Sequence, residues 1–316
     1  MGLSTAVHPP VGQSPRPPVR WLPGRVQTIG WLRGLALTSI VANVVIVVTG
    51  GAVRLTDSGL GCPTWPKCTD ASLTPTKQYA IHGIIEFSNR QLTFVLAVVA
   101  VATWLVAMAL RRERTLATAA ALGIPAQAVL GGLTVLTHLN PWLVALHFLL
   151  SMAIIAVTFV LWWRLRDLRP IAPVPAPAVW LTRVTLAVTA ATLAIGTVVT
   201  GSGPHAGDKD ASGQVHRTGL QVSSMAQLHA DVVMVLIGLT VGLVALCYVL
   251  PGSAAIRRSA SVLLAVELAQ GVIGFTQYFL HVPPLLVALH MLGACLVWLA
   301  ALRTATSVET GISRHR

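Results

Sequence analysis

The chain has 316 residues, of which 54% are hydrophobic and only 10% are charged. Soluble domains carry roughly 25% charged residues, so this composition excludes an ordinary soluble domain. Long apolar stretches recur along the whole chain, each with enough residues to cross a bilayer as a helix. They lack the alternating apolar and polar pattern of barrel strands. Because lipid cannot hydrogen-bond to the backbone, only helices and closed barrels span a membrane, so we expect these stretches to be helices. We therefore predict an all-α integral membrane protein.

Eight membrane-spanning helices are predicted, in chain order, at 34–53, 80–108, 116–137, 142–163, 179–200, 226–249, 259–280 and 284–302. They divide the chain into five parts. These are a disordered basic tail (1–33), a four-helix unit (34–168), a Pro-rich linker (169–178), a second four-helix unit (179–302) and a second tail (303–316).

The basic residues indicate how the chain is oriented. Most of the 22 Lys and Arg residues fall in the two tails and in the segments that follow the second, fourth and sixth spans. The positive-inside rule then places both termini in the cytoplasm, with the spans in the plasma membrane. The net charge of +12 is thus explained by topology, and nucleic acid is not expected as a partner.

Two cysteines share the segment between the first and second spans, Gly61-Cys-Pro-Thr-Trp-Pro-Lys-Cys68. The predicted topology places this segment outside the cytoplasm, where disulfides form. We expect a bridge between Cys62 and Cys68. The alternative is two free thiols. A metal site is not favoured, because two ligands are too few for one.

An internal repeat relates residues 127–147 to residues 270–290. A constant offset pairs Gln127 with Gln270, Gly131 with Gly274, His138 with His281, Pro141 with Pro284 and His147 with His290. The earlier spans match more weakly, with Gly51 opposite Gly196 and Asn89 opposite His229. Two units with the same orientation imply a pseudo-two-fold axis along the membrane normal. We therefore expect two related four-helix bundles.

Three histidines within the spans are candidate ligands. His147 and His290 each lie six residues after a proline, which is about 9 Å into the helix. His229 lies near the start of its span, so His229 and His290 come from two helices at similar depth. Such a pair suits a flat ligand, and haem iron commonly takes axial histidines. The alternative is that each histidine only hydrogen-bonds to another helix.

Two further repeated histidines, His138 and His281, fall at the predicted membrane interface. Here two interpretations stay open. They could have an ordinary interfacial role, or they could contact the carboxylates of a bound ligand.

Several segments resemble the haem A synthase family of bacteria and mitochondria. The resemblance covers residues 34–302, and its marks are residues 50–66, 85–90 and 199–208 together with the repeated histidines. It implies that the second unit keeps a haem b between His229 and His290. The first unit would take haem O as substrate and oxidise its C8 methyl group to the formyl group of haem A, which terminal oxidases use.

The resemblance also implies roles in the first unit. It implicates Glu86 as a catalytic acid or base, although an ion pair with Arg90 at i+4 is the alternative. It makes His147 an axial ligand. The family often reads Glu-x-x-His-Arg on the second span, but this chain has Asn89 in place of that histidine, with His82 as a nearby substitute. Candidates to bind the haem propionates are Arg54, Arg90, His138 and His281.

The expected partners follow from this resemblance. They are haem O, dioxygen or water, membrane lipid and an electron donor that the sequence does not identify. Haem O synthase, oxidase assembly factors and further copies of the chain are left open as partners. Two rival functions are a membrane di-haem electron carrier of the b type and a transporter, because parallel repeats also occur in transporters.

Overall fold

The computed structural model describes residues 28–76, 80–166, 174–208, 213, 215–250 and 254–312. These residues form eight helices and no strand. The helices are α1 (Ile29–Leu55), α2 (Ala80–Leu110), α3 (Arg114–Leu136), α4 (Pro141–Arg164), α5 (Ala176–Ser202), α6 (Val222–Val249), α7 (Ala254–Phe279) and α8 (Pro284–Ile312). Each is long and apolar enough to cross a membrane. The predicted all-helical, eight-span membrane fold is therefore confirmed.

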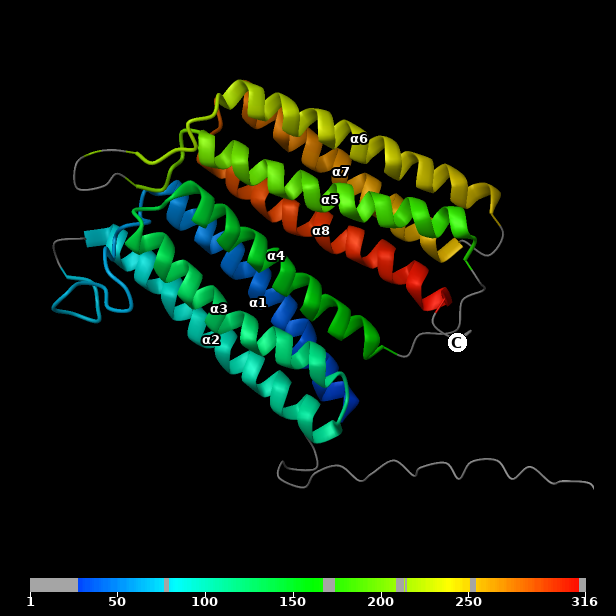
Figure 1. Cartoon of the computed structure of the whole chain (residues 1–316), viewed down its shortest axis with the longest axis horizontal. Helices are drawn as coiled ribbons and strands as arrows, with labels where there is room; N and C mark the ends of the chain where they lie inside the picture. Colours follow the sequence, from blue (N-terminus) through cyan, green and yellow to red (C-terminus); the bar gives the residue numbers. More distant parts are fainter. Residues whose placement is uncertain are drawn as a thin grey trace, which may run out of the picture.

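The helices pack as two four-helix units that lie side by side (Figure 1). In the first, which we call the amino unit, α1 and α3 each contact both α2 and α4. In the second, the carboxyl unit, α5 and α7 each contact both α6 and α8. The units meet through α1, α4, α5 and α8, which leaves α2, α3, α6 and α7 on the outside.

A buried apolar cluster joins the two units. Its members come from the four inner helices: Ile40, Val47, Met152, Ile155, Phe159, Trp163, Leu193, Cys295, Trp298 and Leu302. Within it, the indole nitrogen of Trp298 donates to the carbonyl of Met152 over 2.9 Å. Because this cluster draws on both units, they form one packed body rather than two loosely tethered bundles.

The molecule has two distinct ends. The connections after α1, α3, α5 and α7 gather at one, which we call the disulfide end (Figure 1). The last turns of α2, α4, α6 and α8 lie at the other, the arginine end, together with the start of α1. Which end faces the cytoplasm stays a prediction.

The internal repeat extends to the backbone conformation. At the end of α3, His138 and Leu139 have φ of +52° and +59°, and at the end of α7, His281 and Val282 have φ of +58° and +55°. The amides of Leu139 and Val282 each donate to the carbonyl five residues earlier, over 2.8 and 2.6 Å. The two turns are therefore equivalent, and few non-glycine residues adopt this left-handed conformation.

Several helices are longer than predicted. Helix α8 continues ten residues beyond the predicted end at 302, because Thr304, Ser307 and Val308 are buried rather than exposed to lipid. The hydroxyl groups of Ser259 and Ser307 lie 3.2 Å apart, so polar residues here pack between helices and lower the hydropathy without ending the helix.

The predicted tails and linker overlap these helices. Helix α1 begins at Ile29, inside the segment predicted to be disordered, because the Thr28 side chain accepts a hydrogen bond from the Trp31 amide and caps it. Helix α5 begins at Ala176, inside the predicted linker, with a proline in its first turn. The predictions for residues 1–27, 169–173 and 313–316 lie outside the described residues.

Candidate functional site

The structure brings His229 of α6 and His290 of α8 together inside the carboxyl unit. Their ring centres lie 6.5 Å apart, with an angle of 69° between the ring planes. A metal–imidazole bond of about 2 Å on each side, plus roughly 1 Å from each nitrogen to its ring centre, would separate two in-line imidazoles by about 6 Å. The spacing of this pair therefore fits a single metal ion between two rings.

Glycines on the neighbouring helices make room for both rings. A Cβ atom on Gly196 of α5 would stand 3.1 Å from Cε1 of His229, and one on Gly274 of α7 would stand 3.3 Å from Cε1 of His290. The Nδ1 atom of each ring is buried without a hydrogen bond in the described part of the chain, although the Thr192 carbonyl lies near the His229 ring. Two imidazoles packed against bare backbone are a donor set that suits axial ligation of haem iron.

The amino unit repeats half of this arrangement. A Cβ atom on Gly131 of α3 would stand 3.1 Å from Cε1 of His147 on α4, and Nδ1 of His147 is likewise buried without a partner among the described residues. The side-chain amide of Gln127 donates to the His147 carbonyl over 3.0 Å, and that of Gln270 donates to the His290 carbonyl over 2.6 Å. A glutamine, a glycine and a histidine thus recur in both units.

Asn89 of α2, the predicted counterpart of His229, lies against α1. Its Oδ1 accepts a hydrogen bond from the Thr49 hydroxyl over 2.8 Å, and a Cβ atom on Gly50 would lie 3.9 Å from its Nδ2. Gly50 therefore lies beside Asn89 as Gly196 lies beside His229, whereas Gly51 was the residue predicted to match Gly196. A Cβ atom on Gly51 would instead clash with Met291 of α8, at the contact between the units.

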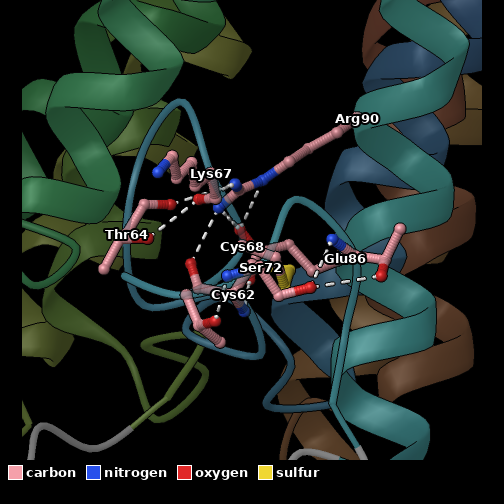
Figure 2. The surroundings of a disulfide bond; sticks show 9 residues. Cys62, Thr64, Lys67, Cys68, Ser72, Glu86 and Arg90 are labelled. Atoms are coloured by element: carbon pink, nitrogen blue, oxygen red, sulfur yellow. Dashed lines mark hydrogen bonds and ion pairs between the residues drawn. A yellow bond between two sulfur atoms is a disulfide. The ribbon is translucent and has the colours of Figure 1, made fainter.

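Glu86 and Arg90 form the i,i+4 ion pair that was the alternative to a catalytic role, and together they hold the segment containing the disulfide (Figure 2). Nη1 of Arg90 donates to the carbonyls of Thr64 and Lys67 over 3.0 and 3.3 Å. Nη2 donates to the carbonyl of Cys62 over 2.8 Å. The Cys62 amide donates to Oε2 of Glu86 over 2.6 Å. The expected disulfide between Cys62 and Cys68 is present.

These contacts constrain the chemistry of both side chains. Nε of Arg90 donates to Oε1 of Glu86 over 3.1 Å, and Nη2 donates to the same oxygen, so all five N–H groups of Arg90 have acceptors in the protein. Glu86 is only 5% exposed, and both of its oxygens accept hydrogen bonds. A haem propionate could bind Arg90 only if some contact to this segment were released, and a proton bound by Glu86 would compete with the contacts of its oxygens.

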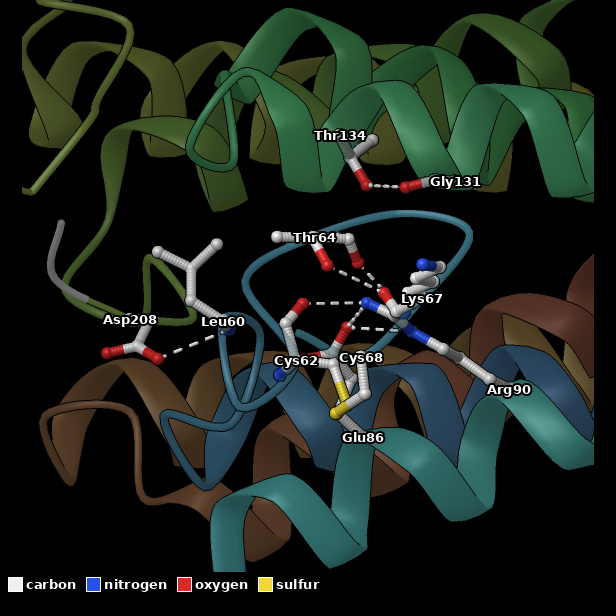
Figure 3. A network of polar contacts seen from close by, with 10 residues as sticks. All are labelled: Leu60, Cys62, Thr64, Lys67, Cys68, Glu86, Arg90, Gly131, Thr134 and Asp208. Carbon is white, nitrogen blue, oxygen red and sulfur yellow. Dashed lines mark hydrogen bonds and ion pairs between the residues drawn. A yellow bond between two sulfur atoms is a disulfide. The ribbon is translucent and has the colours of Figure 1, made fainter. Parts of the chain in front are cut away.

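The segment from Gly61 to Cys68, which we call the disulfide loop, crosses from α2 to α3 (Figure 3). On the α2 side it is held by Arg90. On the α3 side, the ring of Trp65 lies over Gly132, where a Cβ atom would come within 2.8 Å of three of its atoms. Gly131, which packs on His147, is the preceding residue of α3. The loop therefore covers the disulfide end of the amino unit, directly beside the His147 site.

The other predicted histidines lie at the disulfide end, away from the unit interiors. Nδ1 of His82 lies 2.9 Å from the Ser58 hydroxyl, and the His82 side chain is exposed. His138 stacks on His216 with ring centres 6.3 Å apart, and His281 is exposed in the repeated turn. Their roles as ligands or propionate partners stay predictions.

Arg54 and His205 connect the two units at this end. Arg54, at the end of α1, donates to the carbonyls of His205 and, over 2.9 Å, Thr200. Nε2 of His205 lies 2.8 Å from the Val282 carbonyl in the turn after α7. The sequence did not assign a role to His205, although it lies in one of the segments that carry the family resemblance.

The described residues contain no group of three or more His, Cys, Asp or Glu side chains arranged to hold a metal ion. Two-histidine ligation needs no such group, because the porphyrin supplies the other four ligands of a haem iron. The donor chemistry of the site therefore fits haem better than a protein-only zinc site, which takes four ligands from side chains.

Removing Arg90 should free the disulfide loop. In Arg90→Ala the loop carbonyls lose donors whose individual contributions are about 1.5–3 kcal/mol. We expect dithiothreitol to reduce the Cys62–Cys68 bridge at least about tenfold faster, which corresponds to about 1.4 kcal/mol. Lys67→Ala is the matched control, because the exposed Lys67 contributes only its backbone carbonyl. Equal reduction rates in both variants would show that Trp65, rather than Arg90, holds the loop.

Comparison with known proteins places the chain in a family. A family profile described as "Cytochrome oxidase assembly protein" matches residues 33–302. A heme A synthase of Lysinibacillus sphaericus is 35% identical over 136 residues, covering 42% of this chain and 44% of the relative. A heme A synthase of Geobacillus thermodenitrificans is 29% identical over 155 residues, or 48% of each chain. The matched regions thus span less than half of these relatives. The family profile covers all eight predicted spans and leaves out only the first residues of α1 and the last residues of α8. The chain therefore belongs to the cytochrome oxidase assembly protein family (COX15-CtaA).

Proposed function

We propose that this protein is a haem A synthase, which oxidises the C8 methyl group of haem O to a formyl group with the help of a bound haem b. The observation that carries the proposal is the pair of imidazoles from His229 and His290, with ring centres 6.5 Å apart and a glycine beside each ring. The names of the relatives support the same activity.

The carboxyl unit would hold the haem b. His229 and His290 would be its axial ligands, with Gly196 and Gly274 leaving room for the rings. A haem with two strong axial ligands supplies one-electron redox chemistry, which is the cofactor's contribution rather than the protein's. The chain's own part is to fix both imidazoles at one depth and to exclude water around them.

The amino unit would bind the substrate, haem O. His147 would provide one strong ligand, whereas Asn89 faces the interior with an amide that binds iron weakly and is held by Thr49. The substrate iron would therefore keep one weakly filled face, where dioxygen or water could approach. The disulfide loop would cover this site, with Glu86 and Arg90 at its edge.

Glu86 is our candidate for proton transfer in the reaction. Its Oε2 accepts from the Cys62 amide and its Oε1 accepts from Arg90, so a proton on this carboxyl group would replace one of these contacts. The orientation of the chain also belongs to the proposal: both termini would be cytoplasmic in the plasma membrane, with the disulfide end outside. The electrons would come from a donor outside the described residues.

The activity can be tested by haem extraction and mass analysis. The chain is expressed in bacterial cells that make haem O but no haem A, and the haems are extracted from the membranes. Haem A should appear with the wild-type chain, and should be absent with His290→Ala. Haem O that stays unconverted, beside two unreactive haems each with two strong axial ligands, would instead identify a di-haem electron carrier. A colourless preparation would contradict both functions.

Two glycines of α7 provide a matched test of the haem b site. In Gly274→Ala the new methyl group meets Cε1 of His290 at 3.3 Å, whereas in Gly271→Ala it meets no atom within 4 Å. Both changes alter helix propensity equally, by about 1 kcal/mol. We expect Gly274→Ala to lower the haem content or disturb the low-spin absorption spectrum, and Gly271→Ala to leave both unchanged. Equal spectra in the two variants would argue against His290 as a ligand.

The amino unit should respond to a ligand added on α2. Asn89→His places a second imidazole opposite His147 and should convert the substrate haem from high spin to low spin. His82→Ala should not change the spin state, since His82 lies about 10 Å along α2 from Asn89 and its ring is held by Ser58. Absorption and electron paramagnetic resonance spectra measure both effects. A wild-type low-spin signal that disappears in His82→Ala would make His82 the ligand instead.

A further inference from the structure

The carboxyl unit contains a buried carboxyl group that the proposed reaction does not use. Glu267 of α7 is only 3% exposed. Its Oε1 accepts a hydrogen bond from the Thr240 hydroxyl over 3.0 Å, and its Oε2 is buried without a hydrogen bond among the described residues. Neither of the two ion pairs found in the described residues involves Glu267. A buried carboxyl group without a cation is costly in a membrane and is a functional candidate by default.

Helix geometry places this group below the histidine pair. Glu267 precedes Gly274 by seven residues, so the two share a face of α7 to within about 20° and lie about 10 Å apart. Thr240 follows His229 by eleven residues, which also returns it to the same face of α6 to within about 20°. The hydrogen bond between Thr240 and Glu267 confirms that both faces point inward. The carboxyl group therefore lies inside the unit, on the arginine-end side of the rings.

The amino unit has no equivalent. The repeat offset places Ile124 where Glu267 stands, and the α2–α6 correspondence places Ala100 where Thr240 stands. Ala100 and Ile124 belong to one apolar cluster and line the same small cavity. At this level the carboxyl unit therefore has the polar pair Thr240 and Glu267, and the amino unit has the apolar pair Ala100 and Ile124. A role for Glu267 must belong to the unit that holds both histidines.

Few other titratable groups share this interior. Helix α7 packs between α6 and α8. From α6, His229 lies above Thr240 on the same face, and Cys247 lies two turns below it. From α8, His290 faces the interior, whereas Cys295 belongs to the cluster between the units. Asp231 and Arg303 are exposed. Glu267 is therefore the acidic group of the described residues that lies inside the carboxyl unit near the histidine pair.

We propose that Glu267 binds one proton when a haem held between His229 and His290 is reduced, so that reduction leaves the charge inside the carboxyl unit unchanged. This rests on the haem site of the proposed function. The haem iron accepts one electron, which comes from dithionite in the test and from the electron donor of the reaction in the cell. The Glu267 carboxylate takes one proton from water and becomes a carboxylic acid. The single hydrogen of the Thr240 hydroxyl lies within reach of both Oε1 and the Leu236 carbonyl, so Thr240 can donate to the carboxylate of the oxidised state and accept from the carboxylic acid of the reduced state.

The test is a potentiometric titration of the purified, haem-containing protein at several pH values, followed by absorption. For a one-electron couple linked to one proton, each tenfold fall in proton activity lowers the midpoint potential by up to about 59 mV. We expect the wild type to show this dependence over part of the pH range and Glu267→Gln to show a flat profile. Glu113→Gln, in the amino unit, is the control and should behave as the wild type.

A second measurement needs no variant. Infrared difference spectra between the reduced and oxidised wild-type protein should contain a protonated carboxyl band in the reduced state. This measurement decides the question even if Glu267→Gln does not fold. Absence of the band from the wild-type protein would overturn the proposal. A midpoint potential that does not depend on pH would overturn this proposal and leave the proposed function intact. So would a pH dependence that survives in Glu267→Gln and disappears in Asp231→Asn. A preparation without haem would overturn the proposed function and this proposal with it.

Discussion

Lipid offers no water to polar groups, so the polar side chains between these helices need partners within the protein. Most have one: the hydroxyl groups on the inner face of α5 all donate to carbonyls of the preceding turn (Thr182, Thr185, Thr189 and Thr192). The exceptions are concentrated. The Nδ1 atoms of the three interior histidines and the Oε1 atoms of Gln127 and Gln270 are buried without partners in the described chain. Buried polar atoms that lack partners call for an explanation, and here most of them surround the proposed haem sites.

The same constraint explains the disulfide loop. Its carbonyls at Cys62, Thr64 and Lys67 all accept hydrogen bonds from Arg90. Arg90 is itself neutralised by Glu86, whose second oxygen accepts from the loop backbone. One ion pair on α2 therefore supports an entire irregular segment. The loop structure depends on the same two side chains as the proposed proton transfer, so a loss of activity on changing Glu86 would not by itself reveal a chemical role.

Some of this arrangement could be predicted from the sequence, and the limits have physical causes. The repeat predicted that His147 and His290 occupy equivalent positions in their helices, because the spacing of each from a proline is a local property. The predicted match of Gly51 to Gly196 could not draw on side-chain contacts, and in the structure Gly50 rather than Gly51 lies beside Asn89. The i,i+4 spacing suggested the ion pair of Glu86 and Arg90, but its contacts with the disulfide loop depend on a fold that no local pattern specifies. The extension of α8 was missed since Thr304 and Ser307 are polar yet buried between helices.

The equivalent turns after α3 and α7 have an evolutionary consequence. Two four-helix units that share a backbone conformation down to paired left-handed residues are what duplication of one ancestral gene would leave. Before fusion, such units would have met as a symmetric homodimer across the surface now formed by α1, α4, α5 and α8. In a homodimer both sites must carry identical residues. Joining the copies in one chain removes that requirement, so that His229 in one unit can stand opposite Asn89 in the other, and the proposed haem b site and the proposed substrate site can diverge from one ancestral site.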